Sequence, residues 1–416
     1  MKTLKLALGW AIAISTTQII AQPVVINPMS AATQATQQGT LGGTPDNTGC
    51  DYALVNVSGV LTEYRISVGD VGALAEICWV PKGGTLCAGT DRLGLAIGLG
   101  VTKDPDVVSI VSASIGLGTE RQHLLVTYLG KVSSTDPFWD VYIEMFEWNG
   151  TIFTSNSTHN ISINGGTEPC NNPNIDADYQ GNYAVTWEEA HNIYIATDDG
   201  LGNWGSAPTN FMNISNGCNT GGDEEKPDVC IIHDATGGGF SLINVTYIHA
   251  TNSIAMRRVW TNQVTPGLSN YPSVNCGIKH MTLDYNINNY GLLIQDPGPP
   301  RIACPSEITG TRSVYDFTVV FSNTTSVDDI YAITHDQGTY GLGWVVINLP
   351  NISGFTSYPA QGTDYNHSRP VVAYKDWADE YVIAWEFQDH SASPWNAYTP
   401  TNNNVNLVAV LCDDAG

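Results

Sequence analysis

The chain is poor in charged residues and poorest in basic ones, which excludes several classes of partner. Charged side chains make up 13% of the 416 residues, and 16 basic residues stand against 40 acidic ones, giving a formal net charge of −24. Nucleic-acid binding depends on Lys and Arg that neutralise phosphates, so we expect no nucleic-acid partner. The acidic balance also disfavours anionic lipid, whereas it suits neutral glycans or cations such as calcium.

Long apolar runs, helical periodicity and several catalytic motifs are also missing. After the first 21 residues no segment approaches the ~20 apolar residues of a membrane span, so none is expected. No dozen residues keep a 3.6-residue apolar period. The nine cysteines include no Cys-x-x-Cys pair, which argues against a zinc ribbon or a thioredoxin-type site. A zincin helix, a P-loop, a nucleophile elbow and a dinucleotide fingerprint are absent.

The N-terminus has the pattern of a secretory signal peptide. Lys2 and Lys5 precede an apolar run from Leu6 to Ser15, and Ala21 is a suitable cleavage site. We therefore expect a signal peptide at 1–21, a flexible segment at 22–49, and a secreted or cell-surface protein. Export makes disulfides the default. The candidate pairs are Cys78 with Cys87, across a Pro-Gly turn, and Cys50 with Cys412, and we expect Cys230 to stay unpaired.

Short strand-like segments separated by Gly and Pro predict an all-β fold. The segments are rich in Val, Ile, Tyr and Trp, and 41 Gly and 21 Pro residues fall between them. Short strands that begin with a proline recur along the chain, and we call each of them an opening. The spacing between the openings predicts one further unit whose opening lacks the proline. The openings fall near residues 105, 173, 227, 272, 314 and 370. Units of ~40 to 50 residues with four strands predict a monomeric β-propeller of about six blades over 50–416. A seventh blade also fits, because 50–103 holds ample strand material.

The last unit leaves its closure open. Its third strand reaches Cys412 just before the sequence stops at Gly416. An N-terminal strand, for example Leu61 to Val68, could supply the fourth strand and close the ring. Alternatively, the native chain continues beyond this point.

Turns after several third strands resemble the Asp-box of sialidase-type (BNR-repeat) propellers. The matching segments are Thr334-His335-Asp336-Gln337-Gly338, Thr197-Asp198-Asp199-Gly200 with Trp204, and Cys412-Asp413-Asp414-Ala415-Gly416. In that family the box is a structural turn, so the resemblance implies fold roles for Asp199, Asp336 and Asp414. The leader resembles those of exported Bacteroidetes proteins. The resemblance does not extend to catalysis, since Arg301-Ile302 is followed by Ala303 rather than the family's proline.

Candidate ligand-binding residues lie at the ends of the first strands and in a repeated Trp-Glu pair. The first strands of a propeller line its central axis, so residues near their ends should converge. These are Asp176, Asp178, His233, Asp234, His280, Lys375 and Asp376. They could hold a cation or a polar sugar, or form a solvated rim. Trp187-Glu188 and Trp385-Glu386 could hold a sugar by stacking and hydrogen bonding, or pack between blades.

The sequence is compatible with three functions. The main expectation is a non-catalytic propeller, not an enzyme, that binds a glycan or an extracellular protein at one mouth of the channel. The first alternative is a carbohydrate-active enzyme, a glycoside hydrolase or lyase, that uses carboxylates at that mouth. The second is a structural segment of a larger adhesin. No catalytic residue and no cofactor is expected, although a structural calcium ion is compatible with the acidic surface.

Overall fold

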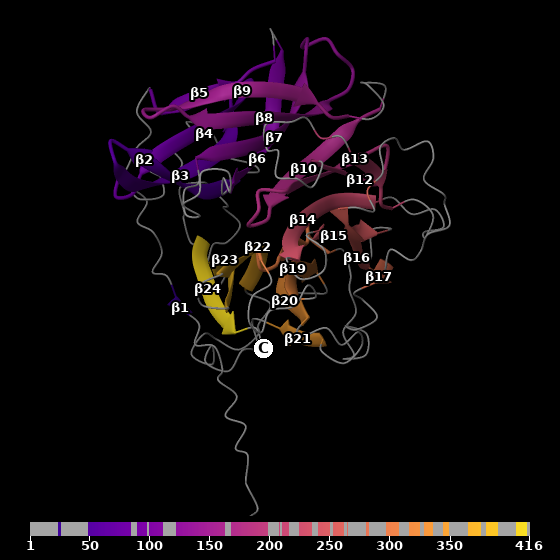
Figure 1. Cartoon of the computed structure of the whole chain (residues 1–416). Helices are drawn as coiled ribbons and strands as arrows, with labels where there is room; N and C mark the ends of the chain where they lie inside the picture. The colour runs from indigo at the N-terminus through magenta and orange to yellow at the C-terminus, as the bar shows by residue number, and fades with distance from the viewer. Residues whose placement is uncertain are drawn as a thin grey trace, which may run out of the picture.

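The computed structural model describes twenty ranges of the chain, and everything below concerns these residues. They are 24–25, 49–84, 90–97, 100–110, 122–162, 168–198, 208, 210–215, 224–234, 240–249, 253–261, 264, 280–282, 297–307, 316–324, 328–335, 344–348, 365–375, 380–389 and 405–413. Within them, twenty-four strands form six four-stranded sheets. The sheets follow one another in chain order around a common centre (Figure 1), as the blades of a β-propeller do.

Each blade is an antiparallel meander. Blade 1 holds β2 (Cys50–Val57), β3 (Val60–Val71), β4 (Leu74–Pro81) and β5 (Arg92–Leu95). Blade 2 holds β6 (Val101–Ile110), β7 (His123–Lys131), β8 (Asp140–Trp148) and β9 (Phe153–Asn160). Blade 3 holds β10 (Cys170–Ala177), β11 (Tyr183–Glu189), β12 (Asn192–Thr197) and β13 (Asn210–Asn213).

The second half repeats this order. Blade 4 holds β14 (Glu224–Asp234), β15 (Phe240–His249), β16 (Ser253–Trp260) and β17 (His280–Thr282). Blade 5 holds β18 (Arg301–Ala303), β19 (Phe317–Thr324), β20 (Asp328–His335) and β21 (Trp344–Asn348). Blade 6 holds β22 (Tyr365–Lys375), β23 (Glu380–Asp389), β24 (Val405–Asp413) and, as its fourth strand, β1 (Val24–Val25).

The hydrophobic core lies between the blades. One buried cluster joins blades 1 and 2 through residues such as Trp79 and Phe146, and others join blades 2 and 3, 3 and 4, and 4 and 5. Five second strands place a buried aromatic side chain at the same position. These are Tyr128, Trp187, Tyr247, Phe321 and Trp385, each at most 1% exposed. A blade cannot bury both of its faces alone, so stacking its neighbours creates the core.

The recurrent prolines mark a β-bulge at the start of the first strand. The register shifts between Lys103 and Asp106, and it shifts at the equivalent places in β10, β14 and β22. Asp104, Asn172 and Lys226, which precede these prolines, have φ values of 52°, 49° and 52°. Proline has no N–H for the sheet ladder, and a bulge is a place where none is required.

Two features of the sequence-based partition are corrected. Blade 5 opens at β18, not near Pro272 or Val314, which both lie outside the described residues. The misassignment arose because the chain between β16 and β18 is long, so a regular spacing placed an extra opening inside it. The ring is closed by Val24 and Val25, which pair with Ala409 and Val408. Leu61 to Val68 instead belong to β3 of blade 1.

Helices contribute nothing to the described part of the chain. Consequently, no helix there is long and apolar enough to cross a membrane.

Candidate active site

The first strands of adjacent blades lie side by side and run in the same direction. Asn174 Nδ2 in β10 donates to the carbonyl of Pro227 in β14 at 2.6 Å. Further along both strands, the Ile231 N–H donates to Asp176 Oδ2 at 2.9 Å. The two contacts advance together, so the N-terminal ends of these strands meet at one mouth of the ring and the C-terminal ends at the other.

Four aspartates on these strands bridge neighbouring blades, and we call them the axial carboxylates: Asp51, Asp106, Asp176 and Asp228. Each accepts a backbone N–H from the next blade. The donors are Ser109 to Asp51 at 2.6 Å, Ile175 to Asp106 at 3.1 Å, Ile231 to Asp176 at 2.9 Å and Ile302 to Asp228 at 2.8 Å. An innermost strand has no partner on its axial side, so its N–H groups need such acceptors.

The axial carboxylates are crowded. A Cβ atom on Gly49 would stand 3.0 Å from the Asp106 Cα and closer still to its Oδ1. Only glycine therefore fits beside Asp106 at this point of blade 1.

Burial raises the pKa of three axial carboxylates. For Asp106 the pKa rises to about 6, where repulsion from Asp228 adds to burial, while the Ile175 N–H and Arg301 oppose it. Burial raises the pKa of Asp176 well above its usual range, and the charges of Asp51 and Asp228 add to the rise. Burial also raises the pKa of Asp228, with Arg301 as the main opposing influence. Carboxyls held partly protonated near neutral pH are typical of catalytic acids.

Arg301 is the cation of this group. It lies at the start of β18, where its Nη1 is 3.6 Å from Asp228 Oδ1 and donates to Asn174 Oδ1 at 3.0 Å. Asp106, Asn174, Asp228 and Arg301 occupy the same place, directly after the opening proline, on four consecutive blades. We call these four residues the axial site.

Glu188 lies at the same mouth as the start of β10. It pairs with Asn171 across the strands, and its carboxylate accepts a hydrogen bond from Asn172 Nδ2 at 3.2 Å. Burial raises the pKa of Glu188, while these amides oppose the rise and Glu225 adds to it. Glu188 is 8% exposed and lies on β11, the second strand of blade 3, behind the first strand at this mouth.

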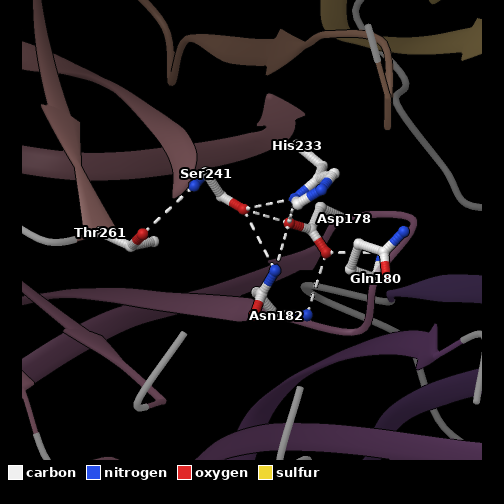
Figure 2. A network of polar contacts seen from close by, with 6 residues as sticks. All are labelled: Asp178, Gln180, Asn182, His233, Ser241 and Thr261. Carbon is white, nitrogen blue, oxygen red and sulfur yellow. Dashed lines mark hydrogen bonds and ion pairs between the residues drawn. The ribbon is translucent and has the colours of Figure 1, made fainter. Parts of the chain in front are cut away.

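A second polar cluster occupies the opposite mouth (Figure 2). Asp178 Oδ1 accepts the backbone N–H groups of Gln180 and Asn182, both at 2.9 Å, and its Oδ2 accepts Asn182 Nδ2 at 2.7 Å. Ser241 Oγ also donates to Asp178, and His233 Nδ1 lies 3.6 Å from it. We call this group the polar hub; it ties blades 3 and 4 together.

The polar hub contains Ser, His and Asp but lacks the arrangement of a nucleophilic triad. In such a triad the imidazole bridges the serine and the carboxylate with its two nitrogens. Here one nitrogen, His233 Nδ1, faces both Ser241 Oγ, at 3.4 Å, and Asp178. Ser241 is also 1% exposed. The cluster therefore has the geometry of a structural link.

His233 should make stability depend on pH. Its hydrogen bond to Asp178 is the largest influence and raises the pKa of His233 above 6.5, while burial opposes this rise. A raised folded-state pKa stabilises the fold fully below the unfolded value near 6.5, and this contribution is lost as pH rises through the folded value. We expect His233→Gln to flatten the unfolding-temperature profile between pH 6 and 8. His159→Gln, on outer strand β9, is the control, and equal profiles for wild type and His233→Gln would contradict the expectation.

The structure brings only some of the sequence-predicted residues together. Asp178 and His233 meet in the polar hub with Asp234 beside them, and Asp176 lies on the axis. His280 is corrected: it lies on the outermost strand of blade 4, opposite Arg257, and not on a first strand. Lys375 and Glu386 lie on β22 and β23, with side chains outside the described set. Asp376, Asp199, Asp336 and Asp414 lie outside the described residues.

Trp187 and Trp385 are also corrected as ligand contacts. They are 0% and 1% exposed, and Trp187 stacks on Tyr194 with ring centroids 5.8 Å apart. An aromatic face that is fully covered cannot stack on a sugar, so their role is packing between blades.

The cysteines follow the expectation in part. Cys78 is disulfide-bonded, and Cys87, its expected partner, lies outside the described residues. Cys50 carries a free thiol, so the expected bridge to Cys412 is absent. Ring closure needs no such bridge, because β1 supplies the missing strand.

Sequence reasoning missed Asp106, Asp228 and Arg301 as site residues. The available signal was their shared position, directly after the proline of each opening. The sequence-based prediction placed the site at the C-terminal ends of the first strands, whereas these residues lie nearer the N-terminal ends.

No metal site emerges from the described residues. They contain no group of three or more His, Cys, Asp or Glu arranged to hold a metal ion.

Comparison with known proteins is informative only at the level of structure. No protein-family model matches the chain, and no curated protein matches it in sequence. Similar solved structures include the intramolecular trans-sialidase from Ruminococcus gnavus, with 8% identity, coverage of 94% of this chain and 97% of that one, and a TM-score of 0.45. A GH93 α-L-arabinofuranosidase of Fusarium graminearum in complex with arabinobiose has 12% identity, coverage of 88% and 92%, and a TM-score of 0.44. A sialidase from Streptococcus pneumoniae has 8% identity, coverage of 90% and 69%, and a TM-score of 0.44.

These similarities describe a shared propeller fold and correct one expectation. The sequence favoured a non-catalytic binding protein over an enzyme, whereas the similar solved structures are glycoside hydrolases and sialidases. That expectation is withdrawn.

Proposed function

We propose that this chain is a glycoside hydrolase whose catalytic carboxylates are Asp106 and Asp228 of the axial site. The observation that carries the proposal is the pair itself: two equivalent aspartates on blades 2 and 4, which repel one another and share the cation Arg301. Glycoside hydrolysis needs two carboxyl groups, one protonated and one ionised, on either side of the scissile bond.

The two environments favour different protonation states. Asp106 has a pKa of about 6, so it is partly protonated in mildly acidic solution and can donate a proton to the leaving oxygen. Asp228 lies next to Arg301, which opposes the burial-driven rise in its pKa and favours its carboxylate form. In this mechanism Asp228 acts on the anomeric carbon or on a water molecule, and hydrolysis consumes one water.

The remaining groups position and support this pair. Asn174 lies on the blade between the two aspartates and accepts from Arg301, so it holds the guanidinium in place. It also donates to the Pro227 carbonyl, directly before Asp228. Both interactions fix the placement of Arg301 relative to Asp228. Holding reacting groups in the correct geometry before the reaction lowers its barrier.

The same proposal includes export. A leader at residues 1–21 would bring the enzyme to extracellular glycans. The Asp-box-like turns would be structural elements of its sialidase-type propeller. Detection of a mature N-terminus at Gln22 in the culture medium of the producing cell would test this part independently of activity.

The experiment is a hydrolysis screen on purified protein. Aryl glycosides of pentoses, hexoses and sialic acid, and plant and animal polysaccharides, would be incubated between pH 4 and 8 and assayed for phenol or reducing sugar. Release that disappears in Asp106→Asn and Asp228→Asn supports the proposal. If no substrate is cleaved, or if both variants cleave as fast as wild type, the proposal fails.

Arg301→Gln should shift the pH profile of the hydrolase. Arg301 lowers the pKa of both Asp106 and Asp228, so removing its charge should raise both and move the pH optimum upward by about one unit. The measurement is kcat/KM against pH with the best substrate of the screen. Arg65→Gln, an exposed arginine on blade 1, is the control. An unchanged optimum in Arg301→Gln would show that the guanidinium does not act on the catalytic pair.

A further inference from the structure

Two cysteines on neighbouring first strands lie in register with one another. The Ile302 N–H of β18 donates to Asp228 of β14 at 2.8 Å, which aligns the two parallel strands. Side chains on one face of a strand recur every second residue. Two residues further along, the side chain of Cys230 therefore points at blade 5 beside Cys304, directly after β18.

The packing confirms this alignment. Cys230 and Cys304 belong to the same apolar cluster between blades 4 and 5, and they are 2% and 9% exposed. The two side chains are within hydrogen-bonding contact of each other, and Asn244 Nδ2 lies 3.9 Å from Cys230 Sγ. Neither cysteine is part of a disulfide in the structure. Two buried sulfur atoms therefore lie next to each other on different blades, in a position to form a disulfide bond.

We propose that Cys230 and Cys304 are a dithiol that oxidises to a disulfide between blades 4 and 5. The bond would join the two first strands just beyond Asp228 and Arg301. It would therefore restrain the two strands that carry Asp228 and Arg301 of the axial site. It also revises the expectation that Cys230 is the unpaired, inert cysteine.

The chemistry is thiol–disulfide exchange with a small-molecule disulfide such as oxidised glutathione. One protein thiolate attacks a glutathione sulfur, forms a mixed disulfide and releases one glutathione thiolate. The second protein thiolate attacks the protein sulfur of that mixed disulfide and releases the other. The protein loses two electrons and two protons, and two molecules of reduced glutathione are formed.

Burial decides when this reaction occurs. Enclosure raises the pKa of the Cys230 thiol, so little thiolate is present in the folded protein and the oxidant has poor access. The bond should therefore form during folding. The oxidising compartment expected for an exported chain would supply the conditions.

Peptide mapping tests the link directly. The full chain would be refolded in a buffer of reduced and oxidised glutathione, denatured without reductant, alkylated, digested and analysed by mass spectrometry. We expect a peptide containing Cys230 joined to one containing Cys304, and two separate peptides after reduction. If both cysteines are fully alkylated before reduction, or if each joins a different cysteine, the proposal is overturned.

Stability provides a second readout, independent of hydrolase activity. The loop closed by the bond spans more than 70 residues, and its loss should lower the unfolding temperature by about 5 °C. Oxidised Cys230→Ala, Cys304→Ala and the double variant should share one unfolding temperature below wild type, because each lacks the same bond. Cys170→Ala, at a buried cysteine elsewhere, is the control for lost packing. The disulfide at Cys78 is present in wild type and in every variant, so it does not affect the differences in unfolding temperature between them. Additive losses in the two single variants would contradict a shared bond.

Discussion

Asp106→Asn should lower kcat for glycoside hydrolysis by about 10²–10⁴-fold, the usual contribution of a general acid. The amide has the shape of the carboxyl and keeps an acceptor for the Ile175 N–H, but it cannot donate the catalytic proton. The measurement is kcat and KM on a substrate whose leaving group needs protonation. An aryl glycoside with a very acidic phenol should be affected least, since its departure needs little help.

The same substitution should leave the protein at least as stable as wild type. Because the folded pKa of Asp106 is about 6, ionisation of this group costs the fold stability as pH rises from about 4 to 6. At pH 8 the cost is at most about 3 kcal/mol, at 1.36 kcal/mol per pKa unit. Asparagine avoids this cost, so chemical denaturation at pH 8 should show a gain of about 1–3 kcal/mol.

Asp51→Asn is the matched control for Asp106. Asp51 also accepts a backbone N–H from the next blade, but it lies on blade 1 and has no part in the proposed chemistry. We expect it to keep its activity. If Asp51→Asn and Asp106→Asn lose activity and stability together, the axial carboxylates are only links between blades.

Trp187→Ala should destabilise the protein by about 3–5 kcal/mol, as large-to-small changes of buried aromatic side chains do. Trp187 is fully buried, stacks on Tyr194 and donates from Nε1 to Glu189 Oε2 at 2.9 Å. Trp187→Phe keeps part of the packing and should lose less. The measurement is urea unfolding followed by fluorescence and circular dichroism.

This prediction separates packing from sugar binding. A packing residue changes stability and leaves KM close to wild type when the assay is run well below the unfolding temperature. A sugar platform would raise KM with little loss of stability. Tyr52→Ala, at an aromatic residue that is 44% exposed, controls for the loss of any aromatic side chain. A large rise in KM for Trp187→Phe would refute the burial argument.

The all-β propeller could be predicted from the sequence because strands and turns depend on the residues next to one another in the chain. Proline-led openings at Pro105, Pro173 and Pro227 mark real bulges, since proline cannot donate to a sheet ladder. The regular spacing failed after Pro227, because the first strand of blade 5 is β18, which begins at Arg301 and not near the predicted opening at Pro272. Ring closure by Val24 and Val25 was also out of reach, because two residues are too few to show a period.

The sequence by itself determined the class of fold and the acidic surface, since strand alternation, turn residues and charge are local or additive properties. Only the tertiary structure decided which carboxylates meet. Asp106 and Asp228 are more than 120 residues apart, and their neighbourhood with Arg301 exists only because three blades place the residue after each opening around one axis. Burial then raises the pKa of both carboxyls, and repulsion from Asp228 adds to the rise at Asp106. Both influences depend on spatial neighbours rather than on residue type.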